Sequence, residues 1–111
     1  MRVLALVPVI GLLAVPAAAQ ETMHQHGSGA DTMQGAMQQM QHGMDMPSSG
    51  DTDTDFARMM IPHHQGAIDM ARTELANGKD PELRQLAEQI IAAQEKEIAF
   101  LKQWLATHGA P

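Results

Sequence analysis

The fold is decided by a five-residue stretch between two helical patterns, Asn77-Gly78-Lys79-Asp80-Pro81. Asn-Gly is typical of a helix end, and Asp-Pro supplies the next helix with an N-cap and a proline at its first position. A connection this short forces the flanking helices to run antiparallel. The sequence therefore predicts an all-α hairpin of helices over about residues 54–76 and 81–107.

Both predicted helices carry a continuous apolar stripe when their residues are placed at 100° steps. His63 and His64 interrupt the first stripe, and Gln94 and Glu97 interrupt the second. If the hairpin is centred on its turn, His63 faces Gln94 and Met60 faces Glu97. Burying an unpaired polar group costs roughly 1–3 kcal/mol. These facing polar side chains would form one polar layer between the helices. The layer is therefore predicted to be hydrogen-bonded internally, metal-bound, or both.

Methionine and histidine recur at helical spacing around this layer. Met59 and His63 are four residues apart, as are Met60 and His64, so each pair shares a helix face. Thioether sulfur is a soft ligand that suits Cu(I). The alternative is a buried His–Glu hydrogen bond with the methionines as ordinary core. The predicted copper ligands are Met59, Met60, His63, His64 and Met70. Glu97 is either a further ligand or, with Gln94, a hydrogen-bond partner of a ligating histidine.

The first nineteen residues have the layout of a secretory signal peptide. Met1-Arg2 precedes an apolar run over 3–15, and Ala17-Ala18-Ala19 ends it with small residues. The run is shorter than the roughly 20 residues that span a bilayer. We expect cleavage near Ala19, a periplasmic or otherwise secreted protein, and no stable membrane insertion afterwards.

The charge and the absence of cysteine narrow the function further. The chain has 7 Lys+Arg against 13 Asp+Glu, and loss of Arg2 with the signal changes its formal charge from −6 to −7. An acidic chain gives no support to nucleic-acid binding, which calls for a basic patch. Small exported domains often depend on disulfides, but this chain has no cysteine. Self-association or a bound metal would stabilise such a small core.

Residues 20–50 have the low-complexity composition of a disordered segment, followed by the hairpin domain over 51–111. Methionines at 33, 37, 40 and 44 would share one helix face, but Gly35 and Gly43 weaken a helix. We expect this segment to become ordered only on binding, and residues 47–50 to act as a linker. Its candidate accessory metal ligands are Met23, His24, His26, Met40, His42, Met44 and Met46.

The stretch over 55–71, with Met-Met-Ile-Pro-His-His at 59–64, resembles a bacterial exported family, domain of unknown function three-hundred-and-five, which includes CopM-type copper-binding proteins. Residues 90–98 and Trp104-Leu105 are similar to the family's second helix. The resemblance implies a ferritin-like four-helix bundle that binds copper or silver through Met59, Met60, His63, His64 and Met70. Family members often have methionine where this chain has Leu101, which leaves a ligand from the second helix in doubt.

One hairpin is half of a four-helix bundle. Either two chains form a homodimer, or residues 31–46 fold over the hairpin as a third helix. We expect a periplasmic protein that sequesters or passes on Cu(I), with Cu(II) or Ag(I) as alternatives. The competing hypothesis is a metal-free helical adaptor with a methionine-rich docking face. An enzyme is not expected, because di-metal oxidases of this architecture use Glu-x-x-His pairs, and the third residue after Glu97 is Phe100.

Overall fold

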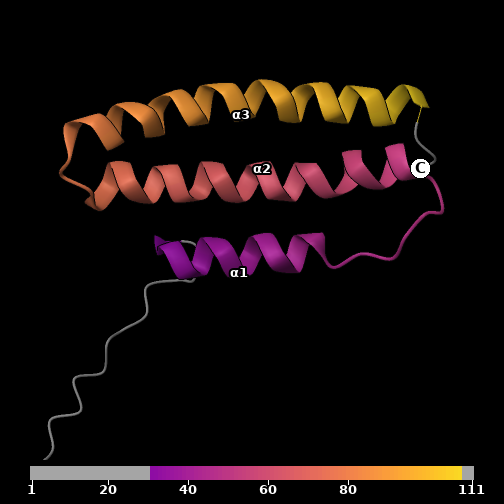
Figure 1. Ribbon diagram of the computed structural model, residues 1–111, viewed down its shortest axis with the longest axis horizontal. Helices are drawn as coiled ribbons and strands as arrows, with labels where there is room; N and C mark the ends of the chain where they lie inside the picture. The colour runs from indigo at the N-terminus through magenta and orange to yellow at the C-terminus, as the bar shows by residue number, and fades with distance from the viewer. Residues whose placement is uncertain (1–30, 109–111) are drawn as a thin grey trace, which may run out of the picture.

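A computed structural model describes residues 31–108 of the chain (Figure 1). It has three helices, α1 (Met33–Met44), α2 (Thr52–Asn77) and α3 (Pro81–His108), and no strand within this range. α2 lies between α1 and α3 and contacts both, while those two do not contact each other. The helices therefore form a single layer. The all-α prediction is confirmed, and the predicted signal peptide over 1–19 lies outside the described residues.

The hairpin has the predicted boundaries to within two residues at each helix end. The side chain of Asp80 caps α3 by accepting a hydrogen bond from the Leu83 N–H at 2.9 Å. Arg84 closes the turn, because its guanidinium donates to the carbonyl oxygens of Leu75 at 2.7 Å and Gly78 at 3.0 Å. The turn is therefore fixed by side-chain hydrogen bonds from the start of α3.

Glycine at position 78 is required for space and not for an unusual backbone conformation. Its φ is −72°, which any residue adopts. A Cβ atom at Gly78 would lie only 2.7 Å from the carbonyl oxygen of Glu74. The expected helix stop is therefore correct, and its physical cause is the close return of the chain over the last turn of α2.

α2 continues through Pro62, where the sequence predicts a kink or a short break. The helix is unbroken from Thr52 to Asn77 with Pro62 inside it. Proline removes one backbone donor there, but the long flanking helical segments preserve the element. The histidines that follow Pro62 therefore lie in a continuous helix.

The expectation of a disordered methionine-rich segment is wrong for residues 33–44, which form α1. The Thr32 hydroxyl caps this helix by accepting a hydrogen bond from the Gly35 N–H at 2.9 Å. Ala36 is completely buried against α2. Packing therefore overrides the low helix propensity of glycine. The third helix that the sequence allowed is therefore present, but it packs beside α2 and not over the hairpin.

The core of the layer is thin and consists mainly of alanine. Ile68 of α2 is the largest fully buried side chain among the described residues, at 2% exposed. Ile98 and Leu101 of α3 pack on the same seam and are also buried. None of the described helices is long and apolar enough to cross a membrane. With only three helices in one chain, most large apolar side chains stay partly exposed.

Candidate metal centre

The polar layer of the hairpin is built on a contact between His64 of α2 and Glu97 of α3. Nε2 of His64 is paired with Oε2 of Glu97. The His64 side chain is 13% exposed, whereas the Glu97 side chain is 57% exposed. The carboxylate therefore reaches inward from the rim, and it favours the tautomer of His64 in which Nε2 carries the proton and donates it to Glu97.

The other ring nitrogen of His64, Nδ1, is buried and has no hydrogen-bond partner. In a neutral imidazole protonated on Nε2, Nδ1 carries a free lone pair. A buried polar atom without a partner costs about 1–3 kcal/mol. A histidine that binds a metal through one nitrogen usually donates its other N–H to a carboxylate or carbonyl. The His64–Glu97 pair therefore has the form of a histidine prepared to bind an ion.

The register of the hairpin differs from the prediction by about one helical turn. Glu97 was expected level with Met60, but it contacts His64, four residues further along α2. Side chains on a helix lean toward the N-terminus of that helix. In an antiparallel pair the two leans are opposed, so contacting residues are offset along the axis. Gln94 is half-buried one turn before Glu97, and it is Glu97 that accepts the hydrogen bond from the histidine.

The four ligands predicted in the first half of α2 lie together but divide into two pairs. Met60 and His64 are half-buried toward α3, whereas Met59 is 38% exposed and His63 is exposed. The rings of His63 and His64 have centroids 6.0 Å apart, with planes inclined at 58°. A ring nitrogen lies about 2 Å from a bound metal ion, so the two rings are close enough to share one ion.

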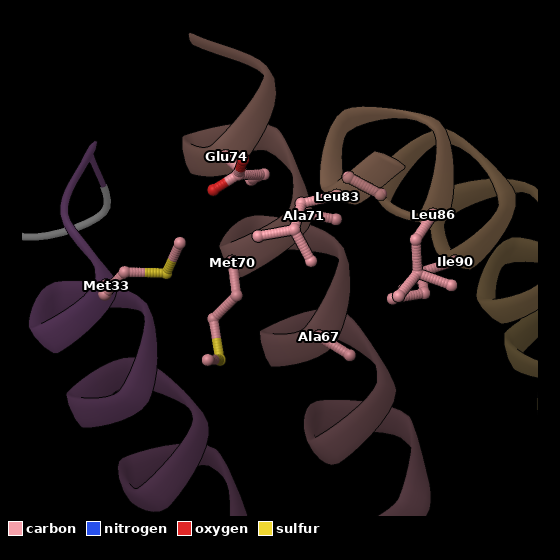
Figure 2. Close-up of a pocket in the computed structure, with 9 residues that line it drawn as sticks. Met33, Ala67, Met70, Ala71, Glu74, Leu83, Leu86 and Ile90 are labelled. Atoms are coloured by element: carbon pink, nitrogen blue, oxygen red, sulfur yellow. The ribbon is translucent and has the colours of Figure 1, made fainter. Parts of the chain in front are cut away.

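Met70 belongs to a different part of the molecule. It lies about 10 Å from His63 along α2, at 1.5 Å per residue. It faces Met33 of α1 across an open groove of about 300 Å³ that also includes Glu74 and Leu86 (Figure 2). Met33 was not among the predicted ligands, although the spacing of the methionines at 33, 37, 40 and 44 placed it on their shared face.

The candidate accessory ligands have different environments. Met40 is a packing residue, because its side chain lies directly against Gly66 of α2. His42 is exposed, and Met44 and Met46 are half-buried. The remaining three candidates, Met23, His24 and His26, lie outside the described residues.

Carboxylates and histidines alone do not form a metal site in the described range. No group of three or more His, Cys, Asp or Glu side chains within 31–108 is placed to hold an ion. An ion at His64 would therefore need methionine sulfur, or ligands from elsewhere, to complete its coordination. This requirement favours a soft ion over one that takes oxygen ligands.

Comparison with known proteins agrees with the resemblance noted in the sequence. A stretch of 46 residues is 44% identical to Uncharacterized protein L153 of Acanthamoeba polyphaga mimivirus. The match covers 41% of this chain and 30% of the viral protein, so the two share one segment. The family model described as Domain of unknown function (DUF305) matches residues 11–105, which include α1, α2 and all of α3 but its last three residues. The chain therefore belongs to the DUF305 family.

Proposed function

We propose that this chain is a periplasmic copper-binding protein that sequesters or passes on Cu(I), with Cu(II) and Ag(I) as further ions. The observation that carries the proposal is Nδ1 of His64, which is buried and without a partner while Glu97 holds Nε2. Met60 lies one turn before His64 on the same side of α2, and the His63 ring is 6.0 Å away. Copper is the cargo, and the proposal includes no catalytic step.

The choice of copper follows from the kinds of ligand available. Thioether and imidazole ligands suit Cu(I), whereas Ca²⁺ and Mg²⁺ prefer oxygen ligands. The chain has 10 methionines and no cysteine. In an oxidising compartment a thioether cannot be lost by disulfide formation, as a thiol can. The leader-like sequence over 1–19 supports such a compartment.

The test is a Cu(I) titration of the purified protein under reducing conditions against a chromogenic Cu(I) chelator. We expect the double variant His63→Ala/His64→Ala to lose tight binding while its helical circular dichroism is retained. Glu97→Gln should keep the stoichiometry but weaken binding by about 10–100-fold, because Glu97 positions the His64 ring.

The matched control is His108→Ala. The His108 ring stacks on Trp104 at the end of α3, with centroids 5.0 Å apart, far from the His64–Glu97 pair. This variant should bind copper as the unaltered protein does. The proposal fails if the unaltered protein retains no copper at micromolar metal, or if the double variant binds as tightly.

A second candidate function is a metal-free helical adaptor. It is supported by the exposure of large apolar side chains, of which Phe56 and Phe100 are 61% and 65% exposed. The same titration separates the two functions, because an adaptor would retain no copper.

A further inference from the structure

The two faces of the helical layer differ in chemistry. Residues 56, 63 and 70 are spaced by seven, which places them on one side of α2. The grooves at the two ends of the hairpin open on this side, one beside Met70 and the other beside Phe56. We call it the apolar face, and its exposed apolar side chains are Met33, Phe56, Met59, Leu83, Leu86 and Phe100.

The opposite face is polar and needs no cover. Gln65 donates a hydrogen bond to Asp69 at 3.0 Å. Arg72 lies 3.9 Å from a carboxylate oxygen of Asp69 and 4.0 Å from one of Glu95 on α3. These side chains are solvated and paired. Association through the large exposed apolar side chains is therefore expected on the apolar face.

The apolar face is self-complementary about His63. At the turn end it has the open groove of about 300 Å³ beside Met70. At the other end the phenyl rings of Phe56 and Phe100 are 61% and 65% exposed and border the second groove. Phe56 precedes His63 by seven residues and Met70 follows it by seven, about 10 Å in each direction. A two-fold axis through His63 would therefore place the Phe56 end of each copy over the Met70 groove of the other.

We propose that the apolar face binds a second copy of this chain in an antiparallel, two-fold arrangement centred on His63. Closed homodimers are the commonest oligomers, and they use one self-complementary patch on both copies. With α2 about 39 Å long, α1 about 18 Å long and helix axes about 9 Å apart, the area between the axes is about 500 Å² on each copy. The total of about 1,000 Å² is at the lower limit for a specific interface, so a weak, reversible dimer is expected.

The dimer would also complete the metal centre, a step that rests on the proposed function. Met59 and His63 are exposed on the apolar face of one chain. The two-fold axis brings both copies of this pair to the centre of the interface. Two histidines and two methionines would then lie around one point, whereas the exposed pair of one chain supplies one of each. Copper binding and dimerisation would stabilise each other.

The first test is sedimentation equilibrium of the metal-free, full-length mature protein. We expect a monomer–dimer equilibrium, with Leu86→Glu raising the dissociation constant at least tenfold. Leu86 is 49% exposed, so this charge should not unfold the chain, and circular dichroism checks that. Gln85→Glu adds the same charge to the outer side of α3 and should leave the constant unchanged. A monomer up to millimolar protein, or equal effects of the two variants, would overturn the proposal.

Cross-linking tests the antiparallel geometry. The chain has no cysteine, so single variants report only the positions chosen. A mixture of Phe56→Cys and Met70→Cys proteins should be joined by a short bismaleimide, and neither protein alone should be. Strong self-linking of Phe56→Cys would mean that the copies are parallel, which contradicts the proposal.

Cu(I) added to the unaltered protein should lower the dimer dissociation constant at least tenfold. Copper bound by a protein that stays monomeric would overturn the dimer and leave the proposed function intact. A dimer that retains no copper would overturn the proposed function and leave the interface intact.

Discussion

α2 has two neighbours, and they are held to it by different means. α3 is attached through buried apolar side chains, with the contact of His64 and Glu97 among them. α1 is attached through close backbone approach, because Met40 lies against Gly66 and Gly43 lies against Pro62. The seam between α2 and α3 depends on the volume of its buried side chains. The seam between α1 and α2 depends on glycines, whose lack of a side chain lets the two helices approach closely. Removing side-chain volume should therefore be most harmful on the α3 side of α2, and adding volume should be most harmful on the α1 side.

The largest effect is expected on the α3 side, from Ile68→Ala. Ile68 is 2% exposed, and the rest of the core consists mainly of alanine. Truncating a buried isoleucine costs about 2–5 kcal/mol through lost burial and the cavity it leaves. Because a core this small gives only marginal stability, we expect the whole hairpin to lose cooperativity. Urea unfolding followed by circular dichroism measures the change in the free energy of unfolding.

Leu83→Ala is the matched control on the same hairpin. Leu83 is 54% exposed, so its truncation removes less buried area and should cost under half as much. Equal losses from the two variants would show that the α2–α3 seam is not the core of the domain.

A smaller and more local effect is expected on the α1 side, from Gly66→Ala. The new Cβ atom would lie 2.6 Å from Cβ of Met40, closer than the two atoms can approach. Overpacking of this kind costs about 1–3 kcal/mol, partly offset by the higher helix propensity of alanine. We expect α1 to detach while the hairpin stays folded. Amide hydrogen exchange should then accelerate in 33–44 and remain slow in α2 and α3.

Gln65→Ala, at the neighbouring and exposed position, raises helix propensity without touching α1. It should leave exchange in α1 unchanged. Faster exchange throughout the chain in Gly66→Ala would contradict the idea that α1 is a separable unit.

The contrast between the seams also explains what could be predicted from sequence. The hairpin was predictable because its signals are local, a stop at Asn77-Gly78, a start at Asp80-Pro81 and apolar spacing between. α1 was not, because Gly35 and Gly43 lower helix propensity. Gly43 lies against Pro62 of α2, a contact with another helix that no local pattern records.

The candidate site was predictable in composition and less so in arrangement. Helical spacing brought Met59, Met60, His63 and His64 together, as the structure does. It did not show that Glu97 contacts His64. Side chains lean along their helix, so Glu97 contacts a residue about one turn away from the one level with it. It also did not show that Nδ1 of His64 is left buried without a partner, since that depends on the ring orientation.

The smallest expected effect concerns the start of α2, which joins the two seams. Hydrogen bonds from the Thr54 side chain and backbone hold the pKa of Asp51 below its usual value. Hydrogen bonds from the side chains of Ser49 and Ser48, and from the Ser49 backbone, do the same for the pKa of Asp55. A carboxyl group whose folded pKa is depressed stabilises the fold above its unfolded pKa, and that contribution is lost as the pH falls through the folded pKa.

We therefore expect the melting temperature to fall modestly between about pH 5 and pH 3, where carboxylates that cap helices become protonated. Asp51→Asn keeps a side-chain oxygen that can accept the Thr54 N–H, at 2.8 Å in the structure, but it cannot titrate. Its melting temperature should change less over this range. Asp53→Asn removes a carboxylate from the same turn and leaves the Asp51 cap intact, so it should melt with the pH dependence of the unaltered chain. If Asp53→Asn flattened the profile as much as Asp51→Asn, general charge repulsion and not capping would set the acid response, because only the cap distinguishes the two positions.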